Sequence, residues 1–169
     1  MSSLQQALPH PVDPPTEQAF LDCLRHHFTF AVRGYVDLLR AVEAEFGPEG
    51  LARVRQRYEE AYVARLAAWG ANAPDRSLRA YCAALDSSCI GSHDWEKVEE
   101  TDTRQAYRYT RCVVADAFRS LGAADIGLWG CELDERTAPA FNPDIKLHRT
   151  KTLMAGDDCC DHVYYTEPE

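Results

Sequence analysis

Apolar residues at helical spacing dominate the first half of the chain. From Thr16, a good helix N-cap, they recur every three or four positions until Gly47-Pro48, a pair that ends helices. The pattern predicts a long helix, with Gly34 as its candidate bend. Its apolar positions are Phe20, Leu21, Leu24, Phe28, Val32, Tyr35, Val36, Leu39, Val42 and Phe46. Residues 1–15, rich in proline and without an apolar period, predict an extended or mobile lead-in.

A second apolar stripe predicts another helix from Pro48 to about Trp69. Its members are Leu51, Val54, Tyr58, Tyr62, Leu66 and Trp69. A Gly-Ala-Asn-Ala-Pro break follows at residues 70–74. Asp75 or Ser77 can then cap a third, shorter helix that reaches about Ser87.

Strand-like alternation replaces the helical period after Gly91. Segments 95–101 and 104–111 alternate polar and apolar residues around a Thr-Asp-Thr connection, which predicts an antiparallel hairpin. Two short helices are expected next. One runs from Cys112 to Leu121, and the other is capped by Asp125, reaches about Thr137 and is ended by Pro139.

The last quarter of the chain predicts a second hairpin. Residues 145–154 and 159–166 form its strands, and Ala155-Gly156-Asp157-Asp158 forms its turn. The element order indicates an α+β fold, in which N-terminal helices precede a small antiparallel sheet of two hairpins with two helices inserted between them. We expect an extended lead-in over 1–15 and a single domain over 16–169, helical over 16–91 and α+β over 92–166.

Composition narrows the function classes. The chain has 169 residues, of which 46% are hydrophobic and 27% charged, as in ordinary globular domains. A net charge of −9 argues against nucleic acid and anionic lipid as partners. The N-terminus lacks the basic start and apolar run of a secretory signal, and no stretch is apolar enough to span a membrane. We therefore expect a cytoplasmic protein with a small-molecule partner, and a homodimer is the candidate assembly.

The cysteines do not predict a disulfide framework or a zinc finger. There are seven, an odd number, and no Cys-x-x-Cys pair occurs. Most are expected to be buried apolar groups. Cys112, Cys131 and Cys160 stand out because each lies near a carboxylate or a histidine in the sequence.

Basic residues interrupt the apolar face of the strand predicted at 145–154. Arg149 and Lys151 share that face with Ile145 and Leu147, since strand side chains alternate. Two interpretations stay open. The cations pair with protein carboxylates, or they form an anion pocket in which Arg149 grips a substrate carboxylate.

The final strand places Cys160 and His162 on one face, two residues apart. Asp158 precedes them and Asp161 lies between them in the sequence. Such a pair can act as nucleophile and base, or as two metal ligands. A structural cysteine beside a hydrogen-bonded histidine also explains the spacing. The spacing alone favours this structural explanation over the catalytic one.

The same segments resemble a known family. Phe141-Asn142-Pro143, the run Arg149-Thr150-Lys151-Thr152-Leu153-Met154 and the run Gly156-Asp157-Asp158-Cys159-Cys160-Asp161-His162 are similar to the C-terminal pattern of the L-2-amino-thiazoline-4-carboxylic acid hydrolase-like family. Cys112 and the run Cys131-Glu132-Leu133-Asp134-Glu135 add to the likeness, which spans about residues 93–165.

The resemblance implies a single hydrolase-like domain over 16–169 that opens a non-peptide C–N or C=N bond in a small carboxylate-bearing ring. It implies that Arg149 and Lys151 bind the carboxylate, and that Asn142, Tyr109 and Asp134 contact the substrate. Asp158, Asp161 or Asp134 would hold the amidinium or activate water. Cys160 and His162 would be nucleophile and base. Alternatively, Cys112, Cys160 and His162 would hold a divalent metal such as zinc, so the cofactor is either none or such a metal.

Two other functions stay open at this point. One is a recruited biosynthetic enzyme that catalyses a non-hydrolytic ring closure or isomerisation. The other is a non-catalytic module that binds a small ligand. No phosphate-binding glycine loop, His-Glu-x-x-His motif or serine nucleophile elbow is present in the sequence, which disfavours the chemistries that depend on them.

Overall fold

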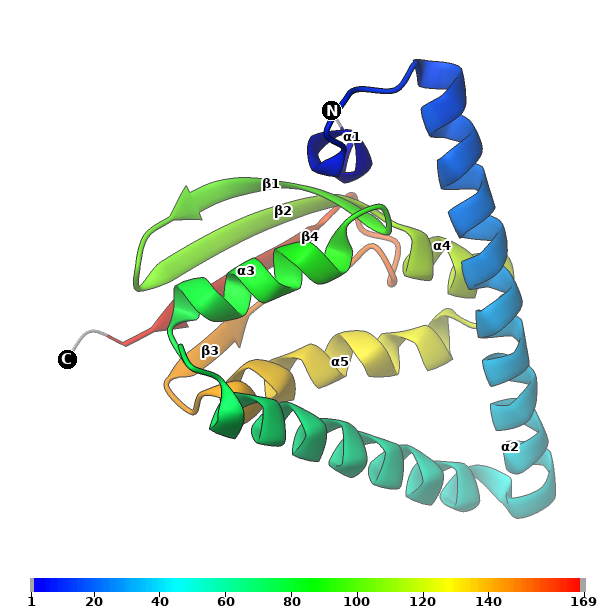
Figure 1. The fold of residues 1–169 in the computed structure, drawn as a ribbon. Helices are drawn as coiled ribbons and strands as arrows, with labels where there is room; N and C mark the ends of the chain where they lie inside the picture. Colours follow the sequence, from blue (N-terminus) through cyan, green and yellow to red (C-terminus); the bar gives the residue numbers. More distant parts are fainter. Residues whose placement is uncertain (1, 168–169) are drawn as a thin grey trace.

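The structure is a computed structural model that describes residues 2–167. It confirms the α+β class: helices lead into a four-stranded antiparallel sheet with strand order β1-β2-β4-β3 (Figure 1). The elements are α1 (Ser3–Ala7), α2 (Pro14–Asn72), α3 (Leu78–Cys89), β1 (His93–Glu100), β2 (Arg104–Cys112), α4 (Val113–Ser120), α5 (Ala124–Phe141), β3 (Ile145–His148) and β4 (Cys160–Thr166).

The long helix α2 is bent at Gly47, not at Gly34. Gly47 has φ 68° and ψ −179°, a conformation that suits glycine, and Pro48 begins the second arm. Figure 1 shows the first arm in blue along one side of the molecule and the second in cyan to green beneath α5. The predicted end at Gly47-Pro48 is thus confirmed as a kink, and the bend expected at Gly34 is wrong.

The lead-in is more ordered than the sequence predicted. Ser2 caps the short helix α1, and the Ser3 amide donates to Asp94 Oδ1 at 2.8 Å, which ties α1 to β1. Helix α2 then starts at Pro14 rather than Thr16, because Asp13 accepts the Thr16 amide at 3.1 Å and proline suits the first helical position.

Helix α5 also departs from the predicted boundaries. Asp125 does not cap it; the N-cap position is Ala123, and Asp125 pairs with Arg40 of α2 at 2.8 Å. The helix continues past Pro139 to Phe141. A proline removes only the hydrogen bond of its own amide and crowds the turn before it. The residues directly after it can stay helical, so the helix completes the turn that contains the proline.

The predicted strand at 145–154 is largely wrong, because β3 ends at His148. Aspartate side chains accept the hydrogen bonds of backbone amides that would otherwise pair with β4. Asp161 accepts from the Thr150 and Lys151 amides, and Asp157 accepts from the Thr152 amide at 2.7 Å. Residues 149–159 therefore form a long looped connection between β3 and β4, and the predicted turn at 155–158 belongs to it.

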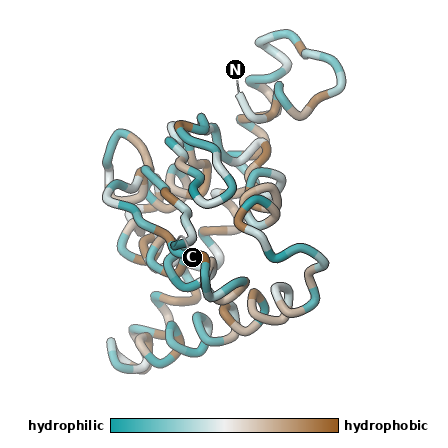
Figure 2. The backbone as a smooth tube through the Cα atoms, turned by 90° about the vertical axis from the view of Figure 1, so that its left-hand side faces the viewer, coloured by the Kyte–Doolittle hydropathy of each residue, from teal (hydrophilic) through white to brown (hydrophobic). Residues whose placement is uncertain are grey.

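Helices α3 and α5 cover one face of the sheet (Figure 1). One buried cluster lies beneath the sheet and includes Tyr81, Tyr107, Phe141 and Tyr164. A second joins the first arm of α2 to α4 and α5, and it includes Val36, Leu39, Phe118 and Ile126. Hydrophilic and hydrophobic residues are interspersed along the helices (Figure 2), as expected for helices packed on one side. Within residues 2–167, no helix combines the length and apolar character needed to cross a bilayer.

Candidate functional site

A cavity of about 450 Å³ lies inside the fold, between the helices and the inner face of the sheet. Cavities of this size hold small molecules in many proteins. Its lining is mostly apolar and aromatic, and its polar side chains come from the helices α2, α3 and α5 and from the strands β1, β2 and β4. The residues that the sequence proposed for the site can be placed against this cavity.

Part of the polar lining comes from alternate residues of the strands, whose side chains face the cavity. On β4, Cys160, His162 and Tyr164 project to the same face, and all three line the cavity. The neighbouring strand β2 pairs Tyr109 with Cys160, so Tyr109 lines the cavity beside them. The rings of Tyr109 and His162 have centroids 5.1 Å apart.

The opposite wall comes from residues of α5 that share one face of the helix. On α5, Gly127, Gly130, Cys131 and Asp134 recur at intervals of three and four residues and face the cavity together. Cys112 lines it as well, and its sulfur accepts the Ala115 amide at 3.3 Å at the start of α4. The structure therefore brings the predicted cysteines, Asp134 and His162 to one cavity, although they come from separate elements.

Asp134 is the only acidic residue among the described residues that line the cavity. Its side chain keeps 40% of its surface accessible. Burial raises the pKa of Asp134 to about 7, even though Arg149 opposes the rise, and Glu135 adds to it. A carboxyl group with this pKa can both accept and donate a proton near neutral pH.

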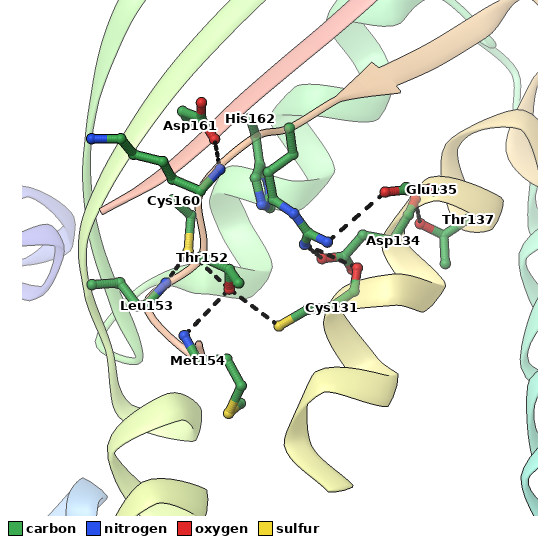
Figure 3. A network of polar contacts seen from close by, with 12 residues as sticks. Cys131, Asp134, Glu135, Thr137, Thr152, Leu153, Met154, Cys160, Asp161 and His162 are labelled. Carbon is green, nitrogen blue, oxygen red and sulfur yellow. Dashed lines mark hydrogen bonds and ion pairs between the residues drawn. The ribbon is translucent and has the colours of Figure 1, made fainter. Parts of the chain in front are cut away.

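Arg149 supports Asp134 from behind and does not line the cavity. Its guanidinium, only 9% exposed, lies 3.6 Å from Asp134 and 4.0 Å from Glu135, and donates to the Cys131 carbonyl at 2.9 Å (Figure 3). The sequence-based pairing of Arg149 with protein carboxylates is thus observed. Its direct grip on a substrate carboxylate is not supported by this arrangement, because its donors face Asp134 and α5.

Two cysteines approach one hydroxyl from opposite sides. Thr152 Oγ1 donates to Cys131 Sγ at 3.6 Å and accepts from Cys160 Sγ at 3.8 Å (Figure 3). The Leu153 amide donates to Cys160 Sγ at 3.3 Å. The 149–159 connection therefore orients both thiols at the cavity wall.

The thiols are protonated at neutral pH. Burial raises the pKa of Cys112 to about 12, and burial also raises the pKa of Cys131 and of Cys160. No hydrogen bond joins Cys160 to His162 within the described residues, so the two do not form a thiolate–imidazolium pair. Their alternation on β4 was predicted correctly, but alternation alone does not bring the sulfur and the ring nitrogen into contact.

His162 presents an unpaired nitrogen to the interior. Its Nδ1 lies 3.3 Å from the Tyr164 hydroxyl, whereas its buried Nε2 has no hydrogen-bond partner within residues 2–167. Burial lowers the pKa of His162 to about 4, with a further contribution from Arg149, so the ring is neutral at physiological pH. A buried polar atom without a partner carries a desolvation cost that a ligand can relieve.

This histidine predicts a pH dependence of stability. The folded-state pKa of His162 is below its ordinary 6.5, so its contribution to stability is present above pH 6.5 and is lost as the pH falls towards 4. His93, with a pKa lowered to about 4 chiefly by burial, acts in the same direction. We expect His162→Gln to flatten the slope of unfolding free energy against pH by up to about 1.4 kcal/mol per pH unit between pH 6.5 and 4.

Urea unfolding of the wild type and His162→Gln across this pH range measures that slope. The exposed His148 on β3 offers a matched surface control, His148→Gln. Identical slopes for wild type and His162→Gln would contradict the assignment of a buried neutral ring.

Several other predicted site residues lie away from the cavity. Lys151 and Asp158 are exposed and pair with each other at 2.9 Å, which lowers the pKa of Asp158. Asp161 secures the 149–159 connection; burial opposes its ionisation, but the bonds from Thr150 and Lys151 lower its pKa. Asn142 bonds to the Arg76 carbonyl at 2.8 Å. The prediction that Lys151 lies on the apolar face of a strand is wrong, because β3 ends at His148.

The candidate metal ligands do not form a preformed metal site. Within residues 2–167, no group of three or more His, Cys, Asp or Glu side chains is arranged to hold a metal ion. Cys112, Cys160 and His162 share the cavity, but Cys112 is engaged with the α4 amide and Cys160 with Leu153 and Thr152. The residues named for the metal alternative therefore do not fit a divalent ion in this arrangement.

Sequence reasoning missed one end of the cavity. The aromatic residues Tyr35, Tyr58, Tyr62 and Trp129 line it, and His93 of β1, also missed, lines the cavity beside Tyr109 with ring centroids 5.9 Å apart. By periodicity, the tyrosines are members of ordinary apolar stripes. The choice of tyrosine, in place of leucine or valine, at three inward positions of α2 was the available signal.

Comparisons with known proteins give one family. The family model of L-2-amino-thiazoline-4-carboxylic acid hydrolase matches residues 25–164. No curated protein matches this chain. Among solved structures, the phenol-responsive sensory domain of the transcription activator PoxR, crystallised with phenol, is similar with a TM-score of 0.46 and 9% identity, over 77% of this chain and 71% of that one.

The family match covers far more than half of the chain and includes both walls of the cavity. It also includes the segments on which the sequence resemblance was based. The chain belongs to the L-2-amino-thiazoline-4-carboxylic acid hydrolase family.

Proposed function

We propose that this protein hydrolyses a cyclic amidine-type ring inside the cavity, with Asp134 as the general base. The observation that carries the proposal is the position of this carboxyl group, with its pKa raised to about 7 mainly by burial, at the wall of a mostly apolar cavity in which it is the only acidic residue among those described. In its ionised form, Asp134 is also the natural partner of a ring amidinium. Family membership supports hydrolase chemistry at the level of the reaction class.

The proposed reaction balances without a cofactor. In a 2-amino-thiazoline ring, Asp134 accepts a proton from water, and the water oxygen bonds to the carbon between the two nitrogens and the sulfur. Because a carbamoyl product keeps both nitrogens, the bond that breaks is the carbon–sulfur bond. The departing sulfur receives the proton held by Asp134 and becomes a thiol, and the second water proton moves from the added hydroxyl to the ring nitrogen as the carbonyl forms. The carboxyl group thus acts first as base and then as acid.

Water is a better candidate nucleophile here than Cys160. Attack by sulfur needs the thiolate, and burial raises the pKa of the Cys160 thiol above its ordinary value. His162 is neutral, and its Nε2 can bind the substrate ring or the attacking water. Cys131 and Cys160 then form a weakly polar wall around the reacting atoms.

Product analysis in ¹⁸O-labelled water tests the proposal. Hydrolysis of 2-amino-thiazoline-4-carboxylate, or of a related cyclic amidine, must place one labelled oxygen in the carbamoyl product and release one thiol. A product without label would instead support ring closure or isomerisation. Saturable binding without any product would support a binding module. Either result would overturn the hydrolytic proposal.

Arg149 is proposed as a positioning residue for Asp134. The nearby guanidinium lowers the pKa of Asp134 against the larger effect of burial. We expect Arg149→Met to move the acidic limb of the pH profile of kcat/KM to higher pH, by about one unit or more, because the ionised carboxylate loses its partner. Lys151→Met is the control, since Lys151 is exposed and pairs with Asp158 outside the cavity. An unmoved acidic limb in Arg149→Met would contradict this role.

The proposed compartment is the cytoplasm. All seven cysteines are free thiols in the structure, which fits a reducing environment.

A further inference from the structure

The cavity is larger than the compound after which the family is named. A thiazoline ring with an amino group and a carboxylate has about nine non-hydrogen atoms and fills about 150 Å³ at the packing density of proteins. The cavity holds about 450 Å³. A ligand of that size at Asp134 leaves most of the space unfilled, and unfilled apolar space forfeits packing contacts.

The charge of the lining does not suit a carboxylate. Among the described residues that line the cavity there is no lysine or arginine, and Asp134 contributes a negative charge when ionised. Arg149, the buried cation behind the wall, is engaged with Asp134 and the Cys131 carbonyl. A buried carboxylate without a cation carries a large desolvation cost. A neutral or cationic head group therefore fits this end better.

One part of the cavity wall, called here the aromatic end, is built from aromatic rings. Tyr58 lies between Tyr35 and Tyr62, with ring centroids 6.4 and 6.1 Å away, and Tyr35 meets Phe118 edge-on at 6.2 Å. Trp129 of α5 completes this end, and Arg55 lies over its ring at 5.1 Å. Centroid spacings of this kind suit aromatic packing, in which a further ring can take part.

The tyrosine hydroxyls at this end are available to a ligand. Within residues 2–167, the hydroxyls of Tyr35, Tyr58 and Tyr62 form no hydrogen bond with another residue. Burial raises the pKa of Tyr35 and of Tyr62, so both are neutral donors at physiological pH. The aromatic end can therefore hold a ring by its faces and a polar ring substituent by hydrogen bonds.

We propose that the substrate of this chain joins a cyclic amidine or isothiourea head, held at Asp134, to an aryl group that packs among Tyr35, Tyr58 and Trp129, and that it carries no carboxylate. The identity of the head rests on the proposed function. The aryl group and the absence of a carboxylate rest on the size, charge and aromatic character of the cavity. The substrate class is thus larger and less acidic than the name of the family indicates.

Calorimetric titration with three compounds tests this substrate class. They are 2-amino-thiazoline, its 4-carboxylate and its 4-phenyl derivative. We expect the phenyl compound to bind about 10- to 100-fold more tightly than the parent, from burial of the added ring. We expect the carboxylate to bind no more tightly than the parent. Equal affinities for the phenyl compound and the parent, tightest binding of the carboxylate, or no binding of any of them would overturn the proposal.

Variants locate the added ring. We expect Tyr58→Ala, at a half-exposed position that tolerates truncation, to remove about tenfold of the affinity for the phenyl compound and to leave the parent compound nearly unchanged. Tyr58→Phe should keep most of that affinity. Tyr165→Ala on β4 is the matched control, because Tyr165 does not line the cavity. Equal losses for both ligands in Tyr58→Ala would contradict the placement.

Thiol release, measured separately, distinguishes the two proposals. Tight binding of the phenyl compound without thiol release would leave this substrate class standing and remove the hydrolytic function. Thiol release with tightest binding of the carboxylate would do the reverse.

Discussion

Asp134→Asn is expected to lower kcat/KM by about 10²- to 10⁴-fold, the usual contribution of a general base. Asparagine preserves the size of the side chain and can still donate and accept hydrogen bonds, but it cannot take a proton from water. Steady-state kinetics on a substrate confirmed by the labelling experiment would measure the loss. The pH dependence should also change, because the titration near pH 7 belongs to the carboxyl group that the variant lacks.

Loss of activity in Asp134→Asn should not come from unfolding. The folded-state pKa of Asp134 is raised above 3.8, so its contribution to stability is present below that pH and is lost as the pH rises through 7. At pH 8 the variant avoids the desolvation cost of the charged carboxylate but also loses its pairing with Arg149, so urea unfolding at pH 8 must show that the variant stays folded under assay conditions. Asp116→Asn, the same substitution at an exposed position of α4 outside the cavity lining, is the matched control. Full activity in Asp134→Asn would remove this residue from the mechanism.

Gly70→Ala is expected to cost about 3 kcal/mol of stability, a large effect for the addition of one methyl group. A Cβ at Gly70 would lie 2.1 Å from the Phe141 carbonyl oxygen and 2.7 Å from its carbonyl carbon. These are backbone atoms of α5, and Arg76 also donates to this oxygen at 3.0 Å. The two helices must separate to admit the methyl group, so thermal unfolding should show a decrease of about 10 °C in Tm.

Gly34→Ala provides the opposite result in the same helix. A Cβ at Gly34 meets no atom within 4 Å, and its backbone is helical. Alanine loses less conformational entropy than glycine, so we expect a gain of about 0.5–1 kcal/mol. Equal Tm values for Gly70→Ala and the wild type would show that the contact between α2 and α5 can relax.

Periodicity predicted the helices and the first hairpin because burial on one face imposes a regular spacing. The apolar positions of α2, for example, follow from its contacts with α4 and α5. The short strand β3 was not predictable in this way. Its extension was lost because Asp161 and Asp157 accept amides of the connection, and a sequence does not state which acceptor an amide will find.

Regular spacing also predicted part of the candidate site. Cys160 and His162 share a face through alternation, and Cys131 and Asp134 share one through the helical period. Arg149 lies beside Asp134 and Glu135, which agrees with one of the two interpretations that the sequence left open, pairing with protein carboxylates. The aromatic end forms because three tyrosines from the two arms of α2 come together across the kink. No local sequence pattern states that residues on different arms lie close together.

Because the second arm of α2 starts at the Gly47 kink, the number of residues after Gly47 fixes where each side chain lies along the arm and which way it faces. Tyr58 and Tyr62 reach the cavity only at their present positions beyond Gly47. Inserting a single residue between Gly47 and Tyr58 would advance both rings by about 1.5 Å and turn them by about 100° around the helix axis, away from the cavity. In a relative with such an insertion, other side chains would form the aromatic end, and its ligand would differ even if Asp134 and its partner were retained.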